Sequence, residues 1–115
     1  MKEKAVKIRS IKAGMEHITL VARVVSISEP KYVLTKYGRA QVASAVLEDE
    51  TGRTVLNLWR WQIKMVRPGD IIRVEGAFAT SFKGRVELNV GSKGRIIVLS
   101  RKNNSPESDN CIMPV

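Results

Sequence analysis

Residues 45–59, AVLEDETGRTVLNLW, decide the fold. An apolar run ends in three consecutive acids and a Thr-Gly turn, and an alternating stretch then finishes on Trp59. This pattern predicts two antiparallel strands joined by a tight turn. Alternation places Leu56 and Leu58 on one face of the second strand and Asn57 and Trp59 on the other. Because leucines mark the core side, we expect Trp59 to point away from the core.

The rest of the chain predicts a small all-β barrel. Five strands are expected, at residues 18–28, 41–47, 53–59, 71–80 and 85–90, with 95–99 as a last short strand or a continuation after a glycine break. Residues 31–40 read as a loop or small hairpin, and 60–66 have the length of two helical turns. Five strands with one short helix between the third and fourth is the order of the OB-fold, a Greek-key barrel that binds single strands and oligosaccharides.

One compact domain suits a chain of 115 residues that is 43% hydrophobic. We expect a basic N-terminal lead-in at 1–14, clipped onto the barrel by Ile8 and Ile11. The OB-fold domain then covers 15–100, and a disordered tail rich in Asn, Ser and acids covers 101–115.

The charge of the chain indicates the class of its partner. Twenty Lys and Arg against eleven Asp and Glu give a net charge of +9, and the excess lies before the tail. A basic folded body attracts polyanions, of which nucleic acid is the commonest soluble one. The single cysteine, Cys111, allows no internal disulfide, and no stretch approaches the ~20 apolar residues of a membrane span. With no signal-peptide pattern, we expect a soluble, cytoplasmic, nucleoid-associated protein.

Two stretches carry a family resemblance. EDETGRTVLNLW at 48–59 and RPGDIIRVEGAFATSFKGRVELNVGSKGRI at 67–96 resemble the archaeal single-stranded DNA-binding proteins with one OB-fold, and more distantly the DNA-binding domains of replication protein A. The resemblance covers about residues 15–97. It implies sequence-tolerant binding of single-stranded DNA in replication or repair, with Trp59, Phe78 and Phe82 as base-stacking aromatics.

The aromatic residues support these roles unequally on their own. Trp59 either forms a stacking platform or packs over the barrel end as a lid, and we favour the platform. Phe82 lies in the basic turn 81–84, where a ligand explains an apolar ring better than the core does. Simple alternation puts Phe78 on the core face, and only a bulge or bend near Gly76 turns it outward. Both orientations of Phe78 stay open.

The remaining candidates flank this face. Trp61 is expected to pack against Met65 at the helical i+4 spacing. Tyr32 and Tyr37 are candidate peripheral stacking residues in the loop between the first strands. Phosphate or polar contacts are expected from Lys31, Lys36, Arg39, Arg53, Asn57, Lys83, Arg85 and Lys93.

Catalytic chemistry has little support. His17 is the single histidine, no Cys/His cluster has metal-ligand spacing, and no phosphate-cradling G-x-x-x-x-G-K loop occurs. Glu48, Asp49 and Glu50 offer carboxylates to a cation, but three acids at a β-turn more often cap and solvate it. We therefore expect a non-enzyme with no cofactor and no metal.

The expected ligand is single-stranded DNA, bound by a monomer that also meets replication or repair proteins. Two alternatives remain at this point. RNA is one, because the same rings stack on its bases equally well. The other is an OB-fold adaptor subunit whose basic face binds an acidic protein and whose aromatics anchor that interface.

Overall fold

The computed structural model describes residues 4–101 of the chain. It contains six strands and two short 3-10 helices: η1 (Ile8–Ser10), β1 (Ile18–Ile27), β2 (Lys31–Thr35), β3 (Gly38–Asp49), β4 (Gly52–Trp59), η2 (Arg60–Lys64), β5 (Ile71–Phe82) and β6 (Arg85–Ser100). No α-helix occurs in this part of the chain. No helix between residues 4 and 101 has the length and apolar character needed to cross a membrane. The predicted tail lies outside the described residues, except for Arg101.

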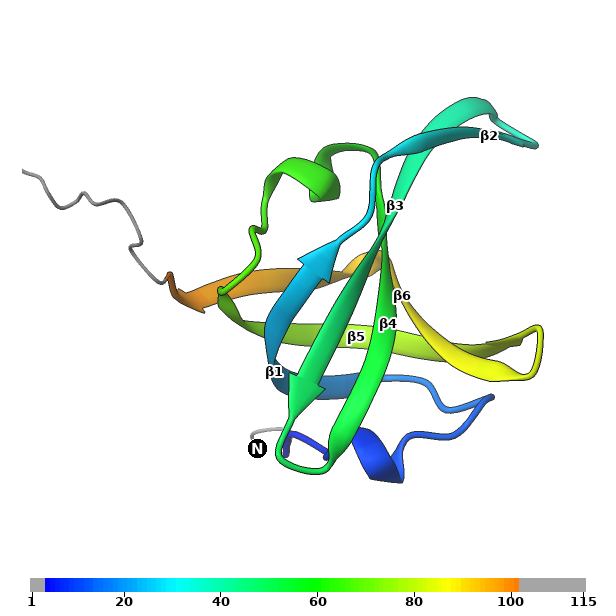
Figure 1. Ribbon diagram of the computed structural model, residues 1–115. Helices are drawn as coiled ribbons and strands as arrows, with labels where there is room; N and C mark the ends of the chain where they lie inside the picture. The colour runs from blue at the N-terminus through cyan, green and yellow to red at the C-terminus, as the bar shows by residue number, and fades with distance from the viewer. Residues whose placement is uncertain (1–3, 102–115) are drawn as a thin grey trace, which may run out of the picture.

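The strands form a closed barrel (Figure 1). The sheet runs in the order β1-β5-β6-β4-β3-β2, and an additional antiparallel pairing of β1 with β3 closes it. All pairings are antiparallel except the short parallel contact of β4 with β6. The all-β OB-fold barrel is confirmed. Residues 31–40 form a hairpin, which adds β2 to the five expected strands at the edge of the sheet.

The short helix predicted after Trp59 is present as the five-residue 3-10 helix η2. The amide of Met65 donates to the Gln62 carbonyl over 3.0 Å, an i to i+3 closure. In a 3-10 helix the side chains at i and i+3 eclipse, so the i+4 spacing of an α-helix does not apply. Trp61 is 67% exposed, and the prediction that it is a packing residue is wrong.

The core lies inside the barrel and is aliphatic. Leu56 and Leu58 of β4 are fully buried, as the alternation predicts, and they meet fully buried residues of the other strands, such as Leu20, Ile72 and Leu88. Burying one such side chain contributes about 1.5–3 kcal/mol. Ile8 and Ile11 of the lead-in are buried in the same cluster. The described part of the lead-in is therefore packed against the barrel through these residues.

Each of the three acids at the β3–β4 turn has a hydrogen-bond or ion-pair partner in another part of the fold or in the turn itself. Asp49 accepts hydrogen bonds from the amides of Ile8 at 2.9 Å and Thr51 at 2.7 Å. Burial opposes ionisation of Asp49, but hydrogen bonds from Thr51 and Ile8 outweigh it and lower the pKa of the carboxyl. Glu48 pairs with Arg53, and Glu50 with Lys7. Residues 4–101 hold no group of His, Cys, Asp and Glu suited to a metal ion.

Candidate nucleic-acid interface

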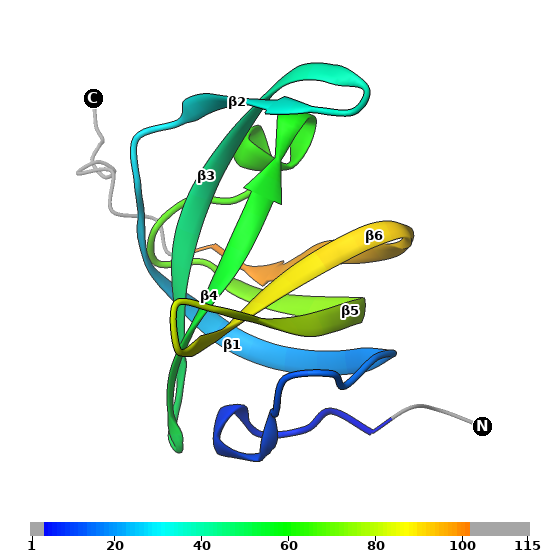
Figure 2. The same cartoon turned by 90° about the vertical axis from the view of Figure 1, so that its right-hand side faces the viewer.

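A cleft of about 670 Å³ opens on the outer face of the barrel, between the β2–β3 and β5–β6 hairpins. Figure 2 looks onto this side, with the β2–β3 hairpin at the top and the β5–β6 hairpin below it. We call it the aromatic cleft; its lining includes Lys31, Val33, Val42, Ser44, Asn57, Trp59, Phe82, Arg85 and Glu87. Strand β4 supplies the middle of this surface, and the two hairpins supply its sides.

Trp59 lies half-buried at the end of β4 with its ring in the aromatic cleft. Its indole Nε1 donates to Oδ1 of Asn89 over 3.2 Å, and its amide donates to Oε1 of Gln62 over 2.9 Å. The ring is therefore held from the side by β6 while part of its surface stays open. This placement agrees with the outward orientation that the alternation of β4 predicts.

A bulge decides the orientation of Phe78. Four residues of β6, 91–94, lie opposite the single Gly76 of β5, so the pairing passes from Glu75–Arg95 directly to Ala77–Val90. Gly76 adopts a φ of +70°, and a Cβ on it would lie 2.8 Å from the Cα of Gly94. Only glycine permits this close backbone approach. The bulge shifts the alternation by one residue, so that Phe78 lies outside the barrel.

Phe78 is 38% exposed, while its neighbours Ala77 and Ala79 are buried. It pairs directly with Asn89 of β6, the residue that holds the indole of Trp59. Phe82 is 49% exposed at the end of β5, and the Nζ of Lys83 lies 5.4 Å from its ring centroid. The three predicted stacking rings thus share one outer face, which runs across β4, β6 and β5.

A polar network fixes the floor of the aromatic cleft. Glu87 is buried, and it accepts hydrogen bonds from the Asn57 side-chain amide and from Nε of Arg85, both at 3.0 Å. Glu87 and Asn89 were not among the predicted site residues. Period-2 alternation in residues 85–90, RVELNV, would have placed both on the outer face with Arg85. Asn57 and Arg85 therefore reach the cleft already oriented by an internal partner.

The other predicted bases fall into four places. Lys31 lines the aromatic cleft, and Lys93 lines a neighbouring hollow of about 560 Å³ together with Phe78. Lys36 and Arg39 lie on the β2–β3 hairpin, near Tyr37 and Tyr32 respectively. Arg53 lies at the opposite end of β4 from Trp59, about 20 Å away at the ~3.3 Å rise per strand residue. It pairs with Glu48 over 3.0 Å and, together with Arg23, lowers the pKa of that carboxyl.

The tyrosines do not line the aromatic cleft. Lys31 and Val33 face it, and the intervening Tyr32 belongs to the other side of β2 by strand alternation. Tyr32 pairs with Gln41 and has the Arg39 guanidinium 4.7 Å from its ring centroid. Tyr37 is exposed at the hairpin turn. The structure therefore brings Trp59 and Phe82 together in the cleft, places Phe78 beside them, and leaves both tyrosines outside.

The closed barrel and its outer row of rings define an OB-fold binding protein. Residues 11–98 match the family model described as "Single-stranded DNA binding protein Ssb-like, OB fold". The chain belongs to this family. The members are binding proteins and not enzymes, so the expectation of a non-enzyme is confirmed.

Relatives agree with this assignment. The chain is 37% identical over 102 residues to the single-stranded DNA binding protein Ssb of Saccharolobus solfataricus, an alignment that covers 89% of this chain and 68% of that protein. It is 34% identical over 83 residues to replication factor A of Methanothermobacter thermautotrophicus, covering 71% of this chain and 10% of that protein. The structure of a replication factor A related protein from Methanobacterium thermoautotrophicum superposes with a TM-score of 0.71 at 28% identity, covering 87% of this chain and 96% of that one.

Proposed function

We propose that the chain binds single-stranded DNA by stacking bases on Trp59, Phe78 and Phe82, with little preference for sequence. The observation that supports this most strongly is the row of three rings on one outer face, across adjacent strands. Each stacked base contributes about 1–3 kcal/mol, and every base has a face that stacks. Three rings therefore supply a gross term of about 3–9 kcal/mol that depends little on sequence or salt.

Phosphate contacts supply the salt-dependent part of the affinity. Lys31 and Arg85 line the aromatic cleft, Lys83 lies over the Phe82 ring, and Lys93 lies beside Phe78. In a plot of the logarithm of the binding constant against the logarithm of the salt concentration, each phosphate that such a base neutralises steepens the slope by about 0.7 for a single strand. Paired bases hide their faces, so the same surface favours unpaired DNA over duplex.

The proposed cellular role is a monomeric coat for exposed strands in replication or repair, in the cytoplasm on nucleoid DNA. The relatives, a single-stranded DNA binding protein and a replication factor, support this role. The net charge of +9 suits a protein that works on a polyanion and meets other proteins assembled there.

A fluorescence titration tests the proposal. In a Trp61→Phe background, Trp59 becomes the only tryptophan and reports on the aromatic cleft directly. The chain is titrated with an oligothymidine, a duplex and an oligouridine, each at low and high salt. We expect the oligothymidine to quench the fluorescence of Trp59 and to bind more tightly than the duplex. The extent of quenching at saturation should be the same at high salt.

Two outcomes contradict the proposal. Duplex that binds as tightly as the single strand would show that unpaired bases are not recognised. Oligouridine that binds more tightly than oligothymidine would make RNA the preferred ligand, since the 2′-hydroxyl is the feature that separates the two backbones.

A further inference from the structure

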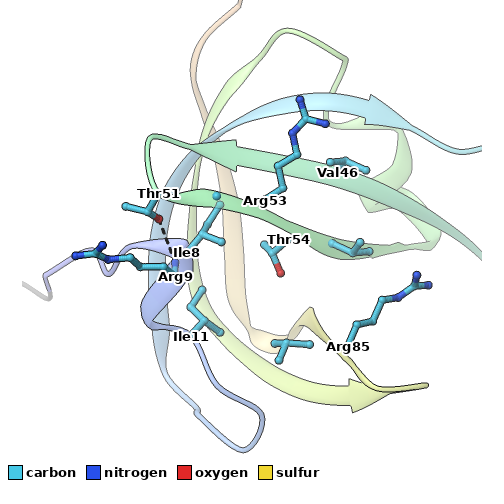
Figure 3. Close-up of a pocket in the computed structure, with 11 residues that line it drawn as sticks. Ile8, Arg9, Ile11, Val46, Thr51, Arg53, Thr54 and Arg85 are labelled. Atoms are coloured by element: carbon cyan, nitrogen blue, oxygen red, sulfur yellow. Dashed lines mark hydrogen bonds between the residues drawn. The ribbon is translucent and has the colours of Figure 1, made fainter.

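A second hollow lies where the lead-in crosses the start of β4 (Figure 3). Its volume is about 410 Å³, within the range of roughly 300–1,000 Å³ that is usual for small-ligand sites. The apolar part of its lining consists of Ile8, Ile11, Val46, Val55 and Val86. The polar part consists of Arg9, Arg53, Arg85, Thr51 and Thr54, together with the backbone of Gly52.

The charged residues that line this hollow are all basic. Three arginines line it and no acidic residue does. The guanidiniums of Arg53 and Arg85 have carboxylate partners outside the lining, Glu48 and Glu87. Within residues 4–101, the Arg9 side chain makes no ion pair. An apolar floor with a cationic rim is complementary to a nucleotide, whose base has apolar faces and whose phosphate is an anion.

The hollow and the aromatic cleft share one lining residue. Arg85 lines both of them, and it pairs directly with Phe82. On β4, Val55 lines the hollow and Asn57, two residues further on the same face, lines the cleft. A strand that stacks on Phe82 therefore meets the Arg85 guanidinium next and reaches the hollow without crossing another element.

The hollow is also held in shape before any ligand arrives. The amide of Ile8 donates to Oδ2 of Asp49 over 2.9 Å, and the amide of Arg9 donates to Oγ1 of Thr51 over 3.1 Å. These bonds attach the lead-in to the β3–β4 turn and fix the Arg9 backbone at the rim. Preorganisation of this kind reduces the ordering cost of binding.

We propose that this hollow holds a further nucleotide of the same single strand, with its base against the apolar floor and its phosphates at Arg9, Arg53 and Arg85. The inference rests on the proposed function and extends it. The path of the bound strand then runs beyond the three rings, along β4 to the lead-in. The acids of the β3–β4 turn contribute by holding that lead-in in place.

Length dependence of binding tests the path. Labelled oligothymidines of increasing length are titrated by anisotropy, and the gain in affinity from a short strand to a long one is measured. The Arg9→Ala, Arg53→Ala double variant is expected to reduce that gain by at least about tenfold. For the longest strand the log–log salt slope is expected to fall by about 1.4, the value for two lost phosphate contacts.

A matched double variant controls for charge. Arg67→Ala with Arg95→Ala removes two exposed arginines that line neither the hollow nor the aromatic cleft. Arg95 is paired with Glu75 over 2.8 Å, as Arg53 is with Glu48 over 3.0 Å. The control should retain the wild-type gain with length. A control that loses as much of the gain as the test variant would overturn the proposal in favour of a general charge effect.

Filling the hollow tests the position of the base. Thr54→Trp places a large side chain in the hollow without changing charge, and its melting temperature is measured to confirm folding. The gain with length should fall in this variant while the salt slope is retained. If the charge variant loses the gain but a folded Thr54→Trp protein keeps it, the base does not enter the hollow.

The outcomes separate this inference from the proposed function. If the wild type binds short strands and the gain with length survives the Arg9 and Arg53 substitutions, the hollow is not part of the path and the stacking proposal stands. If the wild type binds neither short nor long single strands, both proposals fail.

Discussion

The two hairpins beside the aromatic cleft carry similar residues and direct them to opposite sides. In the β5–β6 hairpin, Phe78 and Phe82 lie on the outer face that continues from Trp59. In the β2–β3 hairpin, Tyr32 lies behind the cleft-lining residues, 4.7 Å from the Arg39 guanidinium. An exposed ring beside a base therefore does not define a binding site. The alternation and register of the strand that carries the ring decide whether it meets the ligand.

The cause of this difference is local. The β2–β3 hairpin pairs regularly from Lys31–Val42 to Thr35–Gly38, so the alternation of β2 runs unbroken. The β5–β6 pairing is interrupted at Gly76, and the interruption reverses which residues of β5 point outward. The outward orientation of Phe78 thus depends on the glycines of this interruption, whereas the pairing of β2 with β3 has no such interruption.

The largest effect is expected from a substitution in the β5–β6 bulge. In Gly94→Ala, the new Cβ would lie 2.5 Å from the Glu75 carbonyl oxygen and 2.9 Å from that of Gly76. Backbone must move to relieve these contacts, at a cost near the upper end of the ~1–3 kcal/mol typical of overpacking. Thermal unfolding should show a clear loss of stability, and affinity for oligothymidine should fall as Phe78 is displaced.

The matched control is Gly91→Ala in the same segment. Its new Cβ meets only Cε1 of Phe78, at an ordinary contact distance of 3.7 Å. Stability close to wild type is expected there. Equal losses in both variants would show that the close approach of β5 and β6 is not what requires glycine at position 94.

The next effect concerns the tip of the same hairpin. Phe82→Ala should weaken oligothymidine binding by about 5- to 150-fold, the range that corresponds to one stacked base at ~1–3 kcal/mol. Because the ring is 49% exposed, the melting temperature should change little. Titration and thermal unfolding of one preparation measure both. A large drop in melting temperature with unchanged affinity would identify Phe82 as a structural ring.

A smaller effect is expected from the other hairpin. Tyr32→Ala removes a ring that strand alternation places outside the aromatic cleft, so affinity should change by less than about threefold, which is well below one stacked base. The same titration provides the measurement. A loss as large as that of Phe82→Ala would show that bound DNA wraps around the β2–β3 hairpin, and the contrast between the two hairpins would disappear.

The smallest expected effect is a pH dependence of the melting temperature, and it comes from Glu75 on β5. Arg73 and Arg95 donate to Glu75 over 2.6 and 2.8 Å, and these hydrogen bonds lower the pKa of its carboxyl from the ordinary 4.5. A lowered pKa stabilises the fold above the unfolded-state value and ceases to do so as the pH falls through the folded-state value. Glu75→Gln should therefore melt below wild type at pH 7, and the difference should close in acid.

The control for the pH experiment is Glu29→Gln, an exposed acid in the loop before β2. Its melting temperature should follow the wild type across the same range. A difference between Glu75→Gln and wild type that stays constant from neutral to acid pH would contradict a stabilising role for the ionised carboxylate.

Much of the fold could be predicted from the sequence because strand alternation is a local property. The alternation of leucines in β4 oriented Trp59 correctly, and the β-branched stretch at 18–28 gave the first strand. The type of the helix after Trp59 could not be predicted, because length and spacing do not distinguish an α-helix from a 3-10 helix. The i to i+3 closure there uses the Gln62 carbonyl, and the Gln62 side chain holds the Trp59 amide. Neither contact has a sequence signature.

The site was predictable in part. Phe78 could not be oriented, because its direction depends on residues 91–94 lying opposite Gly76, a pairing between distant parts of the chain. Arg53 shares a strand face with Trp59 but is separated from it by the length of β4. Alternation therefore predicted the face on which Arg53 lies but not its distance from the aromatic cleft. Glu87 and Asn89 were not predicted because neither is an aromatic ring or a base, although period-2 alternation in residues 85–90 places both on the same face as Arg85.

The central claim is that Trp59 stacks on an unpaired base, and a pair of substitutions tests it most directly. Trp59→Ala and Trp61→Ala remove the same side chain from positions two residues apart. Only Trp59 lines the aromatic cleft, whereas Trp61 is 67% exposed on η2 and lies outside it. Anisotropy titration with one labelled oligothymidine should show a loss of about 5- to 150-fold for Trp59→Ala and little change for Trp61→Ala. Unchanged affinity in Trp59→Ala would contradict the account.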